Sequence, residues 1–145
     1  MKKLLILLFL SLGFIGSACT ESEVDKNIKK LKKTNACEGC ILKGADLSEA
    51  NLAGANLTGS NLIGVNLAGA SLKGGILKFS MLTGANLAGA NLSGADLRAS
   101  FGFADLSGAD LTGADISLVN FSGANLTGVI FCRTKTPVGM DDSGC

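Results

Sequence analysis

The sequence predicts an all-β solenoid, in which an extended chain winds into a coil and turns a corner every five residues. Two observations support this prediction. A five-residue unit, Ala-(Asn/Asp)-Leu-(Ser/Thr)-Gly, repeats from Cys40 to Arg133 with a leucine, isoleucine or phenylalanine at its centre. A small residue stands two positions before each centre, and glycine usually stands two positions after it. A sustained internal repeat of this kind indicates a solenoid.

A period of five fits neither a helix nor a continuous strand. On an α-helix, residues five apart are separated by about 500°, so the leucines would form no stripe. On a strand, the odd spacing would place alternate leucines on opposite faces. A chain that is extended locally and bends every five residues puts both the leucine and the small residue inside. Glycine suits the bend because it has no Cβ to clash, and the Asn, Asp, Ser and Thr side chains face water.

The units Ala-Asn-Leu-Ala-Gly at 50–54 and Ala-Asp-Leu-Ser-Gly at 104–108 resemble the pentapeptide-repeat family. The resemblance covers about two-thirds of the chain. It implies a right-handed quadrilateral parallel β-helix with twenty residues per coil, so residues 37–133 would form nearly five coils. At ~4.8 Å per coil the rod would be roughly 24 Å long. A disordered tract is excluded because an apolar residue recurs at every fifth position.

The repeat slips once, because Leu97 and Phe101 are four residues apart instead of five. If the coils stay in register, Phe101 should lie under Phe121 in the column that begins at Leu42.

Bulky apolar residues surround the slip. Phe79 and Leu118 should occupy a corner that is normally glycine, and Met81 and Phe103 should lie nearby. These four residues predict an apolar patch that serves as a binding site for a partner. The alternative, and the favoured one at this point, is a local repair in which bulky side chains fold over the thinned corner.

Residues 1–18 are typical of an export signal. Lys2 and Lys3 precede an apolar run from Leu4 to Ile15, and small residues follow it. The run is too short to span a bilayer as a helix. We therefore expect an exported protein of the cell envelope or periplasm.

Two processing routes are open at the end of the signal. Ser17-Ala18-Cys19 matches the end of a lipobox, although Gly16 stands where a leucine-like residue is expected. Ordinary cleavage after Ala18 would instead release a soluble secreted protein. Acylation of Cys19 would leave four cysteines, an even set, which favours a membrane-anchored lipoprotein.

Residues 19–36 predict a linker and a short capping helix. Thr20 and Glu23 form a possible capping box, and Val24, Ile28 and Leu31 follow at helical spacing. The open end of a β-helix needs a cap because it exposes core and unpaired strand edges. The alternative function is attraction to an anionic membrane. The surrounding lysines are Lys26, Lys29, Lys30, Lys32 and Lys33.

The remaining cysteines flank the repeats. Cys37 precedes the repeats, Cys40 takes the small inward position of the first unit, and Cys132 and Cys145 bracket the C-terminal tail, residues 134–145. In an exported protein structural disulfides are the default, most simply Cys37–Cys40 and Cys132–Cys145, with the second pinning the tail. A zinc site and a redox pair are the alternatives. The two pairs lie at opposite ends of the expected rod, which disfavours zinc.

The composition offers little for catalysis, since the chain contains no His, Trp or Tyr. Asp96 and Asp115 should stack one coil apart, and Asp105 and Asp110 should lie on adjoining faces. Paired carboxylates can act as acid and base or bind Ca²⁺. Each Asp, however, fills a position that Asn fills elsewhere, which favours a solvated face. We expect no catalytic residue, cofactor or metal.

Some pentapeptide-repeat proteins mimic DNA with a strongly acidic surface and bind type II topoisomerases. Here residues 40–133 carry five basic and six acidic side chains, so the span is nearly neutral. Topoisomerase inhibition is therefore not expected. Nucleic-acid binding is not expected either, because no basic stripe with stacking aromatics exists.

Together these features predict an exported, lipid-anchored, non-enzymatic scaffold or protein-binding module of the cell envelope. The alternative is a thiol–disulfide redox protein that uses Cys37 and Cys40.

Overall fold

The structure is a computed structural model that describes residues 21–145. The expected export signal over residues 1–18, the lipidated Cys19 and the possible N-cap at Thr20 lie outside the described residues. Three elements are present in the described part of the chain: α1 (Glu23–Thr34), β1 (Thr134–Thr136) and β2 (Gly139–Asp141).

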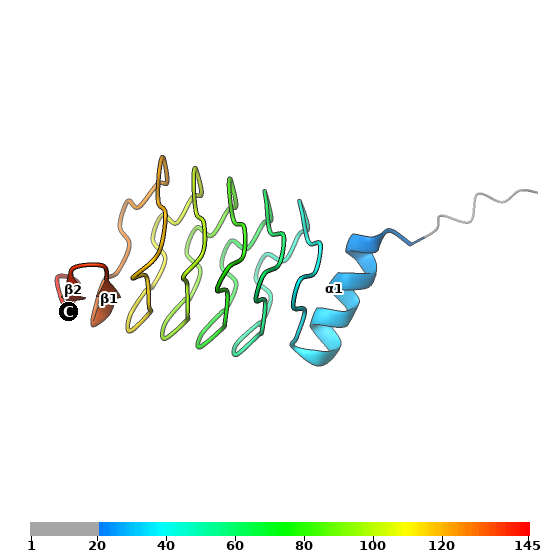
Figure 1. Ribbon diagram of the computed structural model, residues 1–145, viewed down its shortest axis with the longest axis horizontal. Helices are drawn as coiled ribbons and strands as arrows, with labels where there is room; N and C mark the ends of the chain where they lie inside the picture. The colour runs from blue at the N-terminus through cyan, green and yellow to red at the C-terminus, as the bar shows by residue number, and fades with distance from the viewer. Residues whose placement is uncertain (1–20) are drawn as a thin grey trace, which may run out of the picture.

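Stacked coils join α1 to the β1–β2 hairpin (Figure 1). Residues one coil apart form parallel β-bridges, as between Asn61 and Met81, and between Asn66 and Asn86. Each bridge is isolated, because the chain turns a corner before a longer strand can form. The bridges fall into four columns, one for each side of the coil, which agrees with the expected β-helix of twenty residues per coil.

The core of the rod consists of the repeat centres and the small residues two positions before them. Leu57, Leu67 and Leu87 are fully buried, and so are Ala55 and Ala70. Large and small side chains thus alternate around the inside of the coil and fill it. Ser60 and Ser80 are buried at two of the small positions, where their hydroxyls donate to the backbone carbonyls of Cys37 and Leu77.

The corners need a left-handed backbone. Gly59 and Gly84, for example, have φ of 66° and 65°. Glu49, Phe79 and Phe103 take the same conformation, with φ of 56°, 62° and 57°. That conformation is unfavourable for residues with a Cβ.

The prediction that Phe101 lies under Phe121 is confirmed. Ser100 bridges Met81 on one side and Asn120 on the other, so the column stays in register across the slip. The Phe101 and Phe121 ring centroids are 5.7 Å apart. The missing residue is therefore absorbed at the corner and not on a side of the coil.

Helix α1 packs across the N-terminal end of the coils (Figure 1). Leu31 is fully buried, and Val24 and Ile28 pack against the core. Two side chains pair with carbonyls of the first coils: Asn27 Nδ2 donates to Ile41 O at 3.0 Å, and the Asn35 amide likewise donates to a backbone carbonyl. The helix thereby covers both apolar core and strand edge at this end.

The N-terminal start of α1 differs from the expectation. Ser22 is the N-cap, and its side chain and that of Asp25 form the capping box. The sequence analysis placed the box at Thr20 and Glu23. Ser22 and Asp25 satisfy the same three-residue spacing, and the position of the helix on the first coil selects between the two registers.

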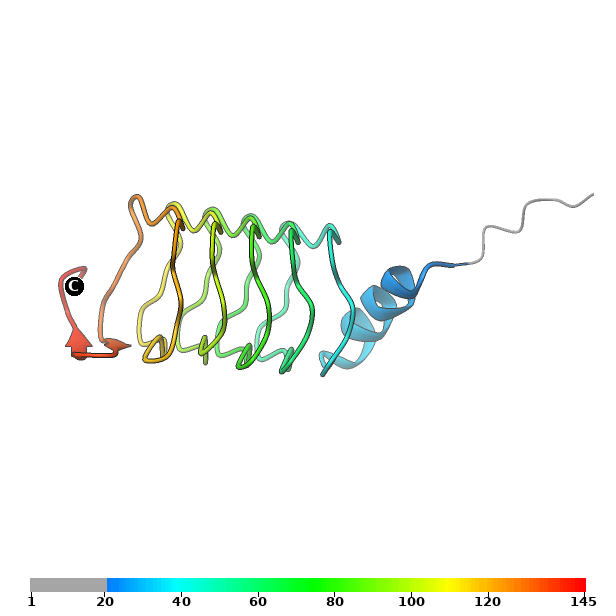
Figure 2. The same ribbon diagram turned by 45° about the horizontal axis from the view of Figure 1, so that its top comes forward.

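The tail forms a β-hairpin that the sequence did not predict. Strands β1 and β2 pair antiparallel, with Thr134 opposite Asp141 (Figure 2). Lys135 also bridges Asp115 in the coil below, so β1 continues the stacking. Thr134 is buried, and its hydroxyl donates to Leu111 O at 2.9 Å.

The hairpin covers its end of the rod less completely than α1 covers the other. Phe121, Leu126 and Phe131 at the last coil are only partly buried. Leu42 and Leu47 at the first coil are essentially inaccessible. The two ends of the core therefore differ in exposure.

Candidate functional site

Four large apolar side chains stand out from one side of the rod around the slip. We call Phe79, Met81, Phe103 and Leu118 the apolar side patch. Their exposed fractions are 70% for Phe79, 44% for Met81, 73% for Phe103 and 72% for Leu118. Phe79 and Leu118 belong to one corner of the coil, Phe103 belongs to the next corner, and Met81 lies on the side between them. The patch therefore spans one side and both of its edges.

The backbone fixes the two phenylalanines. The Phe79 N–H donates to Arg98 O at 2.9 Å, and the Phe103 N–H donates to Ser122 O at 2.8 Å. The Phe103 ring lies over Gly123, where an added Cβ would come within 2.6 Å of it. Because Gly123 has no side chain, the Phe103 ring has room to lie over it.

The expected local repair, in which bulky side chains fold over the thinned corner, stays a prediction beside the partner site; Phe79 and Leu118 are both largely exposed there. At the same corner Arg98 makes two contacts with Asp96, at 2.8 Å and 2.6 Å. Leu118 also occupies its turn without the positive φ of Phe79.

Two disulfides join Cys37 to Cys40 and Cys132 to Cys145. Cys37 is fully buried and Cys40 is only 6% exposed. Neither sulfur atom of that pair is accessible to a protein substrate. Within residues 21–145, no cluster of three or more His, Cys, Asp or Glu side chains could hold a metal ion.

Asp96 and Asp115 lie where the sequence placed them, and neighbouring hydrogen-bond donors lower the pKa of both. Asp96 and Asp115 bridge each other one coil apart. The Ser117 hydroxyl has the largest effect on the pKa of Asp115 and lowers it. Burial opposes this as the second-largest effect, but the Ser117 N–H and Lys135 lower the pKa further, to about 2. Arg98 lowers the pKa of Asp96. Both groups are therefore charged at neutral pH.

The structure also gives the outward polar positions a role that the sequence analysis missed. Where Asn or Asp precedes a repeat centre, its Oδ1 atom accepts a hydrogen bond from the backbone N–H of the residue that follows the centre. The Thr58 N–H, for example, donates to Asn56 Oδ1 at 3.1 Å. Where that residue is Ser or Thr, the hydroxyl often donates to the same atom, as from Ser93 to Asn91 at 2.7 Å. These local bonds satisfy corner amides that would otherwise be unpaired. The recurring (Asn/Asp)-x-(Ser/Thr) spacing was the available signal.

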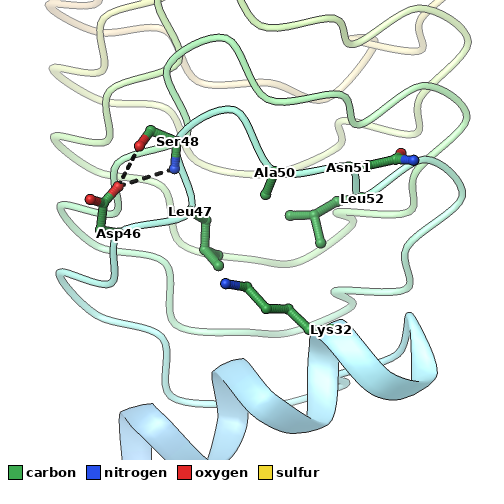
Figure 3. A pocket seen from close by; sticks show the side chains of 7 residues that line it. All are labelled: Lys32, Asp46, Leu47, Ser48, Ala50, Asn51 and Leu52. Atoms are coloured by element: carbon green, nitrogen blue, oxygen red, sulfur yellow. Dashed lines mark hydrogen bonds between the residues drawn. The ribbon is translucent and has the colours of Figure 1, made fainter.

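A cavity of about 300 Å³ lies between α1 and the first coil (Figure 3). Lys32 reaches toward it from α1, and Asp46 and Ser48 stand on the coil, bonded to each other at 2.7 Å. The Ser48 hydroxyl is the main cause of the lowered pKa of Asp46. The sequence gives no signal for this cavity, because the cavity depends on how α1 packs against the first coil. Its lining residues are Lys32, Asp46, Leu47, Ser48, Ala50, Asn51 and Leu52.

Among the described residues, no helix has both the length and the apolar character needed to cross a membrane.

The comparisons with known proteins concern the coils. The family model for pentapeptide repeats matches with eight copies, over residues 40–78, 60–98, 77–115 and 98–133. A pentapeptide repeat protein, Rfr23 from the cyanobacterium Cyanothece 51142, is 30% identical, with 80% of this chain and 98% of that chain covered and a TM-score of 0.61. QnrB1, a plasmid-mediated fluoroquinolone resistance protein, is 19% identical over 68% of this chain and 64% of its own, with a TM-score of 0.52.

The likeness to QnrB1 concerns the fold alone. A comparison with curated proteins finds no match. The family match spans the coils from the first repeat to the last, and these coils carry the buried centres, the glycine corners and the Asn/Asp hydrogen bonds described above. The chain belongs to the pentapeptide repeat family.

Proposed function

We propose that this pentapeptide repeat protein is an exported, non-enzymatic scaffold that binds a partner protein through the apolar side patch. The observation that carries the proposal is the exposure of Phe79, Phe103 and Leu118, each at least 70% accessible beside a well-packed core. Exposed apolar groups that gather on one side of a soluble protein mark interaction surfaces. A stiff rod holds such groups in fixed relative positions.

The backbone at two of these positions supports the same proposal. Phe79 and Phe103 adopt the left-handed corner conformation, in which glycine would fit without strain. Neither side chain is buried in the core, and the Phe103 ring lies on the outside, over Gly123. Strained residues that lack a local structural reason are candidates for function.

The proposed location is the cell envelope, with Cys19 as the lipid anchor. The two disulfides use four of the five cysteines and leave Cys19 as the remaining one. The intact mass of the mature protein from a bacterial host, under non-reducing conditions, tests this. A lipid adduct on Cys19 with two disulfides is expected. An unmodified mass would contradict the anchor.

Photo-crosslinking tests the patch. A photoreactive residue at Phe79 or Phe103 should give a discrete adduct in the native envelope, whereas one at Ser71 or Asn91, on the opposite side of the rod, should not. Adding Met81→Ser should weaken the adduct formed from Phe103. Equal crosslinking from both sides would contradict a role for the patch.

The redox alternative has no supporting observation, because the Cys37–Cys40 pair is buried. A free-thiol titration before and after mild reductant checks this, and the disulfide is expected to resist reduction. Nucleic-acid binding and topoisomerase inhibition also remain outside the proposed function, since the repeat region is nearly neutral.

A further inference from the structure

Four lysines form a single stripe on the outer face of α1. Lys26, Lys29, Lys30 and Lys33 follow the i, i+3, i+4, i+7 spacing that aligns side chains along one side of a helix. All four are exposed. The apolar residues of the helix lie on the opposite side, against the core. We call these four residues the lysine stripe.

The stripe concentrates positive charge at one end of the molecule. Residues 23–34 contain five lysines and two acidic residues, whereas residues 35–145 contain six basic and nine acidic residues. In the rod, Arg98 and Lys135 are neutralised by Asp96 and Asp115. Within residues 21–145, Lys29 is the one stripe residue in an ion pair, with Glu21 at 2.6 Å, and that pair is solvent-exposed. Lys30 makes one weak contact with the first coil, where its Nζ lies 3.9 Å from Cys40 Sγ.

Capping the rod does not require this stripe. The cap needs the apolar face of α1 and the amides of Asn27 and Asn35, which lie on the coil side. Like charges at i+3 and i+4 destabilise a helix. Acidic residues mixed with the lysines would keep the outer face equally soluble. Apart from the single Lys30 contact with Cys40, the stripe therefore has no explanation within the fold.

We propose that the lysine stripe docks on a membrane surface that contains anionic lipids. Lysines near such a surface attract its negative charge over a Debye length, about 10 Å at 0.1 M salt. The apolar face of α1 packs against the core, so the contact is electrostatic and needs no insertion of the helix. Residues 1–20, which carry the expected export signal, join the rod at this same end. The β1–β2 hairpin lies at the opposite end of the rod, away from the stripe (Figure 1).

This orientation goes beyond the proposed scaffold function and does not depend on acylation of Cys19. It would hold the rod upright on the membrane, with the apolar side patch facing sideways and accessible to a partner. The lipid surface is a better fit than a nucleic acid, because the stripe lacks stacking aromatics.

Vesicle binding by the full chain tests the proposal. The probes are phosphatidylcholine vesicles with and without phosphatidylglycerol at about one third of the lipid, which supplies the negative surface charge. Changing all four stripe lysines to Gln should lower affinity for the anionic vesicles by about 100-fold or more, with little effect on neutral vesicles. Raising the salt from about 0.1 M to about 1 M should lower the affinity of the unmodified chain for the anionic vesicles to a similar extent.

The matched control removes four charges from the rod: Lys43, Lys73, Lys78 and Arg133 to Gln. This variant should retain most of the preference for anionic vesicles, and circular dichroism should show that both variants are folded. Equal losses in the two variants would overturn the proposal, because net charge alone would then explain binding. Tighter binding of the stripe to duplex DNA than to anionic vesicles, at the same salt, would overturn it in favour of nucleic acid.

Discussion

At the scale of single residues, each repeat unit closes its own corner. The side-chain Oδ1 of Asn or Asp accepts a hydrogen bond from the backbone N–H two residues later, and glycine supplies the left-handed backbone. Where glycine is replaced by Phe79 or Phe103, the corner keeps its geometry and gains an exposed ring. Single residues therefore set both the regularity of the rod and its exceptions.

The contact between Phe103 and Gly123 gives a first prediction. Gly123 and Gly128 have nearly the same φ, 70° and 69°, but an added Cβ would meet the Phe103 ring at 2.6 Å only at Gly123. Both Gly→Ala variants should lose about 1–2 kcal/mol through backbone strain, and Gly123→Ala should lose more. Thermal unfolding followed by circular dichroism measures this. Adding Phe103→Gly should remove the difference, and equal melting temperatures of the two single variants would contradict it.

The pKa of Asp115 gives a second prediction. Its folded value, about 2, lies below the ordinary value of 3.8, so ionised Asp115 stabilises the fold fully above about pH 4. That contribution is lost as the pH falls toward 2. Because the group is partly exposed, the loss should be about 1 kcal/mol. Urea unfolding at several pH values in this range measures the free energy of unfolding, which should depend less steeply on pH in Asp115→Asn. The same pH dependence in both proteins would contradict a lowered pKa of Asp115.

At the scale of elements, the two ends of the rod are closed in different ways. Helix α1 buries Leu31 completely and covers the first coil. The hairpin is tied by Cys132–Cys145 and leaves the last coil half-exposed. The helix is therefore the stronger cap.

The cap gives a third prediction. Leu31→Ala should destabilise the protein by about 2–5 kcal/mol, because it leaves a cavity between α1 and the first coil. Ile28→Ala removes a partly buried side chain from the same helix and should have a smaller effect. Chemical unfolding measures both free energies. Equal losses of unfolding free energy in the two variants would contradict a special contribution of the buried Leu31 side chain to stability.

At the scale of the whole molecule, stability should vary along the rod. Each coil contacts mainly its neighbours, so opening starts at an end. Hydrogen exchange should be fastest in the coil around Phe121 and Leu126, and slowest in the middle coils. In Leu31→Ala, exchange in the first coil should rise toward the rate of the last. Uniform exchange along the rod would contradict this gradient.

The sequence by itself determined the coil, the register and the slip. These follow from a strict local period: five residues turn one corner, so a missing residue before Phe101 shifts every later position by one and still lets Phe101 lie under Phe121. The cysteine positions likewise restricted the simplest pairing to the one that the structure contains. Nothing distant in the chain was needed for these inferences.

Tertiary structure decided the features outside the repeats. These features depend on contacts between a repeat coil and a segment that does not follow the five-residue pattern. The choice of Ser22 as N-cap and the outward direction of the lysine stripe follow from how α1 settles on the first coil. The hairpin at Thr134–Asp141 forms where the repeat pattern has ended and the last coil offers an edge. The exposure of Phe79 and Leu118 at the slip likewise depends on how side chains of successive coils pack at that corner.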